Sequence, residues 1–191
     1  MKTVQLAVLL LAAALVSTGL DAAEVMSPEQ IGLPIGQPAP AFTAKDQNGR
    51  EISLESLLEK GPVALVFFRS ADWCVYCKLQ LVDLQRNLGE IQAAGGQLAG
   101  ISYDSVEILK RFSDRRTITF PLLSDAGSKT IDAYRIRKKD VAEPWDGVAY
   151  HGMFILDQKG VIRAKLFQVS YRERPALDAL LLALKEAREV P

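Results

Sequence analysis

The sequence predicts an α/β protein, with a central mixed β-sheet flanked by helices. The first observation is the unbroken apolar run VALVFF at residues 63–68, which is typical of a strand buried on both faces. The second is the change of period that follows, where apolar residues recur at steps of three and four up to Ile91 and mark one face of a helix. The third is a further strand at 97–102 and helix at 105–115. Strand–helix–strand spacing of this kind favours parallel pairing with a right-handed crossover.

The other elements can be taken in order along the chain. We expect an extended lead-in without a core of its own at 24–35, a hairpin at 41–53 that turns at Asn48-Gly49, and a short helix at 54–59. The helix after the central strand is expected to stop near Gly95. The C-terminal half is expected to contain an extended piece at 120–123, a helix at 128–136, a polar surface loop at 137–150, a hairpin of 152–156 and 161–169, and a last helix that begins near Pro175.

Composition limits the classes of function. At 191 residues the chain has the size of one domain, and 49% hydrophobic residues are ample for a core. The 23 basic residues equal the 23 acidic ones, so there is no net charge. Nucleic acid is therefore not expected as a partner, because its binding depends on a cationic surface.

Residues 1–23 have the pattern of a secretory signal peptide. Lys2 precedes an apolar stretch from Leu6 to Val16, and small residues follow, so cleavage is expected after Ala22 or Ala23. The apolar stretch is shorter than the roughly 20 residues that span a bilayer, so we expect no stable membrane span after cleavage. An uncleaved anchor is the alternative. The expected location is secreted or periplasmic, where disulfides persist.

Cys74 and Cys77 are the only cysteines in the chain. Cys77 is the first residue of the apolar helical stripe and should be buried. Cys74 lies one turn earlier, at the helix start, where free backbone N–H groups and the positive end of the helix dipole favour a thiolate. This asymmetry predicts an accessible, ionised Cys74 that attacks and a hidden Cys77 that resolves the mixed disulfide.

A Cys-x-x-Cys pair at a helix N-terminus lowers the pKa of its first thiol from about 8.5 into the range of roughly 3.5–7.5. Trp73 should shield the pair, and Trp73 and Tyr76 should shape the surface that meets a partner. A structural disulfide would stabilise weakly, because a loop with two intervening residues closes at little entropic cost. A zinc site needs four ligands, and the two cysteines and one histidine fall short of that number. We expect no metal and no cofactor.

Residues 73–78, WCVYCK, resemble the Trp-Cys-x-x-Cys-Lys motif of thioredoxin, and the order of elements over about 35–190 resembles the thioredoxin fold. Three other stretches resemble the peroxiredoxin-type AhpC/TSA family (alkyl hydroperoxide reductase/thiol-specific antioxidant): GQPAPAF at 36–42, FPLLSD at 120–125, and GMFILDQKGVIR at 152–163. The resemblance implies a thioredoxin-like domain over 36–190 with an N-terminal β-hairpin extension and a redox-active cysteine pair.

The peroxiredoxin pattern Pro-x-x-x-Thr-x-x-Cys ends at the cysteine that attacks peroxide. The resemblance places Cys77 at the position of that cysteine, Cys74 at the position of the threonine and Ser70 at the position of the proline. Ser128 stands where the family has its arginine. Peroxide reduction needs donors that polarise the O–O bond beside the thiolate. These departures therefore favour disulfide exchange over peroxide reduction.

The resemblance to thioredoxin places Phe68 at that family's buried acid, and His151 at the cis-proline that faces the dithiol. His151 is the only histidine. As an imidazolium it would stabilise the Cys74 thiolate, and as a neutral ring it could shuttle the proton. The alternative is a histidine satisfied by local hydrogen bonds. Two cysteines and a distant histidine also resemble copper-delivering Sco-type proteins, although there three residues, not two, lie between the cysteines, and the histidine lies slightly earlier relative to the strand.

The sequence thus predicts an exported thiol–disulfide oxidoreductase in which Cys74 attacks, Cys77 resolves, and Trp73, Tyr76 and His151 support them. Its partner would be a protein dithiol or disulfide, or a thiol reductant. One alternative is a thiol-dependent peroxidase that reduces hydroperoxides, in which either cysteine is oxidised to sulfenic acid. The other is a Sco-like copper carrier or a non-enzymatic module with a structural disulfide.

Overall fold

The computed structural model describes residues 27–139, 141–142, 144–168 and 170–190. The signal peptide expected over 1–23 lies outside the described residues. One seven-stranded sheet has the order β2-β1-β5-β4-β3-β6-β7. Its strands are β1 (Thr43–Asp46), β2 (Glu51–Ser53), β3 (Val63–Phe67), β4 (Gln97–Ser102), β5 (Leu122–Ser124), β6 (Gly152–Leu156) and β7 (Ile162–Phe167). The helices are η1 (Pro28–Gln30), α1 (Leu54–Leu58), α2 (Val75–Arg86), α3 (Leu88–Ala93), α4 (Val106–Arg116), α5 (Lys129–Ala133) and α6 (Leu177–Glu189).

The strand β3 lies inside the sheet, as its apolar run predicts, and every one of its residues is buried. It pairs in parallel with β4 and antiparallel with β6. The mixed sheet and the parallel β3–α2–β4 unit are therefore confirmed. The hairpins β1–β2 and β6–β7 are confirmed as antiparallel pairs.

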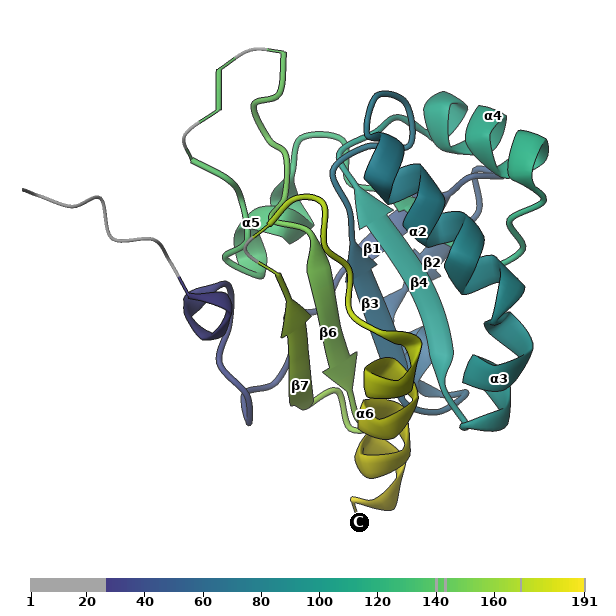
Figure 1. Ribbon diagram of the computed structural model, residues 1–191, viewed down its shortest axis with the longest axis vertical. Helices are drawn as coiled ribbons and strands as arrows, with labels where there is room; N and C mark the ends of the chain where they lie inside the picture. Colours follow the sequence, from purple (N-terminus) through teal and green to yellow (C-terminus); the bar gives the residue numbers. More distant parts are fainter. Residues whose placement is uncertain (1–26, 140, 143, 169, 191) are drawn as a thin grey trace, which may run out of the picture.

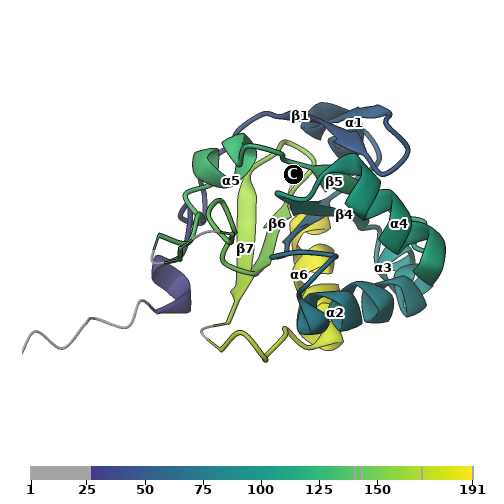
Figure 2. The same ribbon diagram turned by 90° about the horizontal axis from the view of Figure 1, so that it is seen from above.

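Helices cover both faces of the sheet (Figures 1 and 2). On one face α2, α3, α4 and α6 pack over alternate residues of β3, such as Ala64 and Val66. On the other face α1 and α5 pack over Val63, Leu65 and Phe67. The alternation follows from the period of two in a strand, and it buries β3 on both sides.

Two expectations about elements are wrong. The helix after β3 does not run unbroken to Gly95, because Asn87 ends α2 and α3 begins at Leu88. The Asn87 side chain donates to the carbonyl of Asp83 at 2.9 Å, and an asparagine side chain that bonds to nearby backbone in this way favours a helix end. The lead-in at 24–35 is also not extended throughout, because Pro28–Gln30 form η1, and its Ile31 and Leu33 are buried against the α1 and α5 face of the sheet.

Three chain segments converge at one edge of the sheet. Because β3 and β4 are parallel, their carboxyl ends lie side by side, and because β6 is antiparallel to β3, its amino end lies there too. Phe67 is paired with both Ile101 and Gly152. The residues that follow β3 and β4 and precede β6 therefore form one site. No helix among the described residues is long and apolar enough to cross a membrane.

Candidate active site

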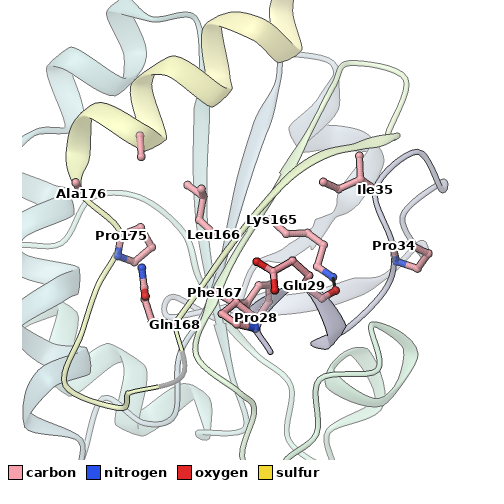
Figure 3. A pocket seen from close by; sticks show the side chains of 11 residues that line it. Pro28, Glu29, Pro34, Ile35, Lys165, Leu166, Phe167, Gln168, Pro175 and Ala176 are labelled. Atoms are coloured by element: carbon pink, nitrogen blue, oxygen red, sulfur yellow. Dashed lines mark hydrogen bonds between the residues drawn. The ribbon is translucent and has the colours of Figure 1, made fainter. Parts of the chain in front are cut away.

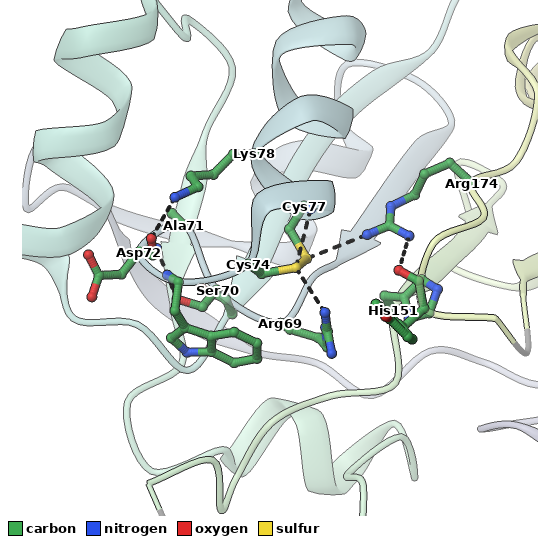
Figure 4. Close-up of a disulfide and its surroundings, with 12 residues drawn as sticks. Arg69, Ser70, Ala71, Asp72, Cys74, Cys77, Lys78, His151 and Arg174 are labelled. Atoms are coloured by element: carbon green, nitrogen blue, oxygen red, sulfur yellow. Dashed lines mark hydrogen bonds between the residues drawn. A yellow bond between two sulfur atoms is a disulfide. The ribbon is translucent and has the colours of Figure 1, made fainter.

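The two cysteines begin α2 and are joined as a disulfide, with their Cα atoms 5.3 Å apart (Figure 4). Cys74 is the N-cap residue of α2, and its Sγ accepts a hydrogen bond from the backbone N–H of Cys77 at 3.2 Å. The expected position of Cys74 at the helix start is confirmed. A negative charge on this sulfur would lie at the positive end of the helix dipole.

The expectation that Cys74 is accessible is wrong for the disulfide form. Cys74 is 1% exposed and Cys77 is 0% exposed, so exposure does not distinguish the two residues. The N-cap position turns the Cys74 sulfur inward toward the helix N–H groups, and arginine side chains lie against the pair. The asymmetry lies instead in the donors, because Sγ of Cys74 accepts two hydrogen bonds and Sγ of Cys77 accepts one.

Arg69, two residues after the end of β3, contacts the first sulfur. Its Nη2 donates to Sγ of Cys74 at 3.4 Å. The guanidinium carbon lies 5.0 Å from the ring centre of Trp73 and 5.3 Å from that of Tyr171. Contacts of this kind between a guanidinium and ring faces are attractive, so both rings help to fix Arg69 at the sulfur.

Arg174, in the segment between β7 and α6, contacts the second sulfur. Its Nη2 donates to Sγ of Cys77 at 3.6 Å, and its Nη1 donates to the carbonyl of Tyr171 at 3.0 Å (Figure 4). Arg69 and Arg174 therefore flank the disulfide from two distant parts of the chain.

These two guanidinium groups carry positive charge without a carboxylate partner. Neither forms an ion pair among the described residues, and the Nε atoms of both are buried without a hydrogen-bond partner there. Burial lowers the pKa of Arg69. Burial, with a further contribution from the charge of Arg69, lowers the pKa of Arg174 to about 10. Both remain protonated at neutral pH, so the sulfurs lie in a partly desolvated cationic environment.

His151 precedes β6 at the same edge of the sheet and is 5% exposed. Its Nε2 lies 3.2 Å from the carbonyl oxygen of Ser170, a local partner of the kind that the alternative interpretation expects. Burial, together with the charges of Arg174, Arg69 and Lys138, lowers its pKa to about 4. The ring is therefore neutral at pH 7.

A buried carboxyl group holds the loop that leads into Cys74. Asp104 follows β4, and its carboxylate accepts hydrogen bonds from Ser70 Oγ at 2.8 Å, Ala71 N at 2.6 Å and Ser102 Oγ at 2.9 Å. Ser70 Oγ in turn accepts from the backbone N–H of Asp72 at 2.9 Å. Burial raises the pKa of Asp104, because charge is disfavoured in a desolvated site.

The expected supporting aromatic residues lie around the pair. Trp73 donates from Nε1 to the hydroxyl of Tyr103 at 2.9 Å, and its ring centre lies 6.2 Å from that of Trp145. Tyr76 packs edge to face on Tyr171, at 5.8 Å between ring centres. The polar loop at 137–150 thus brings the half-exposed Trp145 to the site.

Two cavities lie near the segment between β7 and α6. One, of about 380 Å³, borders the site, because Arg174 and Tyr76 line it together with the apolar side chains of Leu79, Leu84 and Leu177. The other, of about 660 Å³, lies among η1, β7 and the start of α6 and shares no residue with the contacts of the disulfide (Figure 3). No group of three or more His, Cys, Asp or Glu side chains that could hold a metal occurs within the described ranges.

Sequence reasoning missed three residues of this site. Arg69 stands directly before the Ser70-Ala71-Asp72 turn, so its position after a buried strand was an available signal. Asp104 stands at the corresponding place after β4, where a parallel neighbour of β3 must end. Arg174 has no local signal, because 97 residues separate it from Cys77.

Comparisons with known proteins identify the family of this chain. The AhpC/TSA family profile matches residues 35–165. Peroxiredoxin Bcp of Escherichia coli is 30% identical over 132 residues, which cover 68% of this chain and 83% of that protein. The chloroplastic peroxiredoxin Q of Populus jackii is 29% identical over 150 residues, which cover 78% of this chain and 67% of that protein.

The solved structures show the same fold. The crystal structure of the peroxidoxin BcpB of Mycobacterium tuberculosis matches with a TM-score of 0.72 at 22% identity, over 83% of this chain and 99% of that one. A peroxiredoxin-like protein of Aquifex aeolicus matches with a TM-score of 0.72 at 18% identity, over 82% of this chain and 88% of that one. The chain therefore belongs to the AhpC/TSA family, and it is a thiol-dependent oxidoreductase with a thioredoxin-like fold and a Cys74–Cys77 pair.

Proposed function

We propose that the protein is a dithiol peroxidase, in which hydroperoxides oxidise the Cys74–Cys77 pair and a thiol reductant restores it. The observation that carries the proposal is the contact of one guanidinium with each sulfur, by Arg69 and Arg174. Peroxide reduction needs donors beside the thiolate that polarise the O–O bond and stabilise the leaving oxygen. The sequence indicated that these donors were missing, but the two arginines supply them from other positions.

The reaction has two steps. The thiolate of one cysteine attacks the distal oxygen of ROOH, the O–O bond breaks, and the leaving RO⁻ takes a proton to give ROH. The attacking cysteine becomes a sulfenic acid. The thiol of the second cysteine then attacks this sulfur, an S–S bond forms, and water leaves. Two electrons pass from the dithiol to the peroxide in total.

We assign the attack to Cys74. Its sulfur accepts from both the Cys77 N–H and Arg69, whereas the Cys77 sulfur accepts only from Arg174. Hydrogen bonds to the ionised form favour that form, so Cys74 should be the more acidic thiol. The family pattern favours the opposite assignment, with Cys77 as the attacking residue, and variants separate the two.

The cavity beside Arg174 supports organic hydroperoxides as substrates in addition to hydrogen peroxide. Its apolar lining, which includes Leu79, Leu84 and Leu177, offers a place for an organic group beside Arg174, whose guanidinium contacts the disulfide.

The test uses the reduced protein, its Cys74→Ser and Cys77→Ser variants, hydrogen peroxide, and a reagent specific for sulfenic acid. Wild-type protein should consume one equivalent of peroxide and form the disulfide. Cys77→Ser should accumulate a labelled sulfenic acid at residue 74, and Cys74→Ser should react slowly. The reverse labelling would overturn the assignment. Peroxide consumption by the wild-type protein no faster than that of free cysteine would overturn the peroxidase proposal.

Disulfide exchange with a protein partner is the second candidate, and it is favoured by the aromatic surface around the pair. Trp145 and Tyr171 are 47% and 46% exposed and lie beside Trp73 and Tyr76. Exposed aromatic clusters of this kind often form protein contacts. A protein dithiol that reduces the disulfide much faster than a small dithiol at equal concentration supports this candidate. Equal rates would contradict it.

We also propose that the protein is exported. The pattern of residues 1–23 supports this proposal. Fractionation of cells that express the full chain, followed by mass spectrometry of its N-terminus, should show a periplasmic or secreted form that starts at residue 23 or 24. Full-length protein in the cytoplasmic fraction alone would contradict it.

A further inference from the structure

The disulfide and its two arginines form a site whose positive charge meets a negative counter-charge only after reduction. In the oxidised form the sulfurs are neutral, and neither Arg69 nor Arg174 meets a carboxylate among the described residues. We propose that these two arginines raise the reduction potential of the Cys74–Cys77 disulfide, so that the folded protein favours the dithiol form. The inference rests on the dithiol–disulfide cycle of the proposed function and is independent of the oxidant.

The argument follows the charge through the redox step. The disulfide accepts two electrons, the S–S bond breaks, and the two sulfurs take up protons according to their acidity. A thiolate on Cys74 then places a negative charge at the N-terminus of α2, on the sulfur that lies 3.4 Å from Nη2 of Arg69 in the disulfide form. This attraction exists only in the reduced form. Anything that stabilises the reduced form alone makes the disulfide a stronger oxidant.

Burial opposes the thiolate, since a charged group loses solvation in the interior. At this site, however, both guanidinium groups are already desolvated in the oxidised form, and their Nε atoms lack partners there. The cost of burying the cations is thus common to both redox forms. The thiolate is the counter-charge that the cations lack, which favours reduction.

The two rings that flank Arg69 determine how much of this attraction is realised. Trp73 is fixed by its hydrogen bond to Tyr103, and Tyr171 packs on Tyr76, so the guanidinium is held between two positioned rings. A lysine would keep the charge but lose the planar contact with the rings. The contribution of Arg69 therefore depends on both its charge and its planar shape.

The test is the equilibrium of the protein with reduced and oxidised glutathione at pH 7, read from the fraction of alkylated cysteines. The full-length protein is compared with Arg69→Met, Arg174→Met and Arg69→Lys. Each methionine variant should shift the equilibrium constant about tenfold toward the disulfide, which corresponds to a potential lower by about 30 mV. Arg69→Lys should lie between wild type and Arg69→Met.

Arg111→Met is the matched control. Arg111 is 53% exposed, and its guanidinium lies 3.9 Å from Asp72. The substitution therefore removes one positive charge near the site without removing a contact with a sulfur. It should shift the equilibrium less than twofold. Methionine variants within twofold of wild type, or shifts equal to that of Arg111→Met, would overturn the proposal.

A second measurement serves if a methionine variant folds poorly. The wild-type protein should be more resistant to urea in the reduced form than in the oxidised form, because the favourable charge contact belongs to the reduced fold. Greater stability of the oxidised form would contradict the proposal. Neither measurement uses peroxide, so a failure of the peroxidase proposal would be seen separately, in peroxide consumption.

Discussion

Nη2 of Arg174 lies 3.6 Å from Sγ of Cys77, although 97 residues separate them in the chain. The contact exists because the segment between β7 and α6 brings Arg174 to the first turn of α2 (Figure 4). Together with Arg69 it places positive charge at both sulfurs. The chemistry of the pair should therefore depend on these arginines more than on the single histidine.

The acidity of Cys74 tests this directly. We expect a thiolate pKa well below that of a free cysteine, and a rise of about one unit or more in Arg69→Met, because an opposite charge within about 4–6 Å lowers an acid's pKa by roughly 1–3 units. His151→Ala should change it less, since the ring is neutral at pH 7. The pH dependence of alkylation, measured in a Cys77→Ser background, gives the value. A larger change in the pKa of Cys74 in His151→Ala than in Arg69→Met would contradict the role of Arg69 as the charge that stabilises the thiolate.

His151 should instead affect stability in acid. Its pKa is lowered from 6.5 to about 4, so the fold favours the neutral ring, and this contribution is present above pH 6.5 and lost as pH falls through about 4. The difference of about 2.5 units corresponds to roughly 3 kcal/mol of unfolding free energy. Urea unfolding between pH 7 and pH 4 should show this loss in wild type. His151→Gln, which can still donate to Ser170, should lack it, and identical pH profiles would refute the prediction.

Asp104 should be a stabilising residue of the loop before Cys74. Asp104→Asn replaces one carboxylate oxygen with a donor group, which leaves the N–H of Ala71 or the hydroxyl of Ser70 without its acceptor. A buried unsatisfied group costs about 1–3 kcal/mol, so the free energy of unfolding should fall by that amount at pH 7. Asp114→Asn is the control, because its ion pair with Lys110 is exposed and should change stability by less than about 0.5 kcal/mol. Equal effects of the two substitutions would contradict the role of Asp104.

Tyr171 should limit access to the disulfide. Its ring lies against Arg69 and Tyr76 in the segment that leads to Arg174, and both sulfurs are covered. Tyr171→Ala should increase the rate of reduction by a small dithiol severalfold, because the attacking thiolate must reach a buried sulfur. Leu182→Ala, at an exposed position of α6, is the control and should react like wild type. A Tyr171→Ala rate at or below the wild-type rate would show that this ring does not restrict access.

Local pattern was sufficient for the elements that carry the cysteines. The apolar run of β3 and the stripe that begins at Cys77 each depend on neighbours in sequence, and both are found as expected. The break at Asn87 was missed, because an asparagine inside a helical pattern does not by itself distinguish a helix end from an exposed helical position. The packing of Ile31 and Leu33 was missed, since proline-containing segments give no periodic signal.

The site was less predictable than the fold. Position at the helix start suggested an exposed Cys74, but exposure depends on side chains that arrive from elsewhere, and Arg69 and Arg174 lie against the pair. Asp104 reaches the loop before Cys74 only through the parallel pairing of β3 and β4. The protonation state of His151 likewise depends on burial and on both arginines, none of which is local to it.

The most direct test of the central claim is the stopped-flow rate at which the reduced protein reacts with hydrogen peroxide at pH 7, compared with that of free cysteine. Two guanidinium groups at the sulfurs predict a rate far above that of the free thiol, and a large loss of that rate in Arg69→Met and Arg174→Met. A wild-type rate no greater than that of free cysteine would contradict the account.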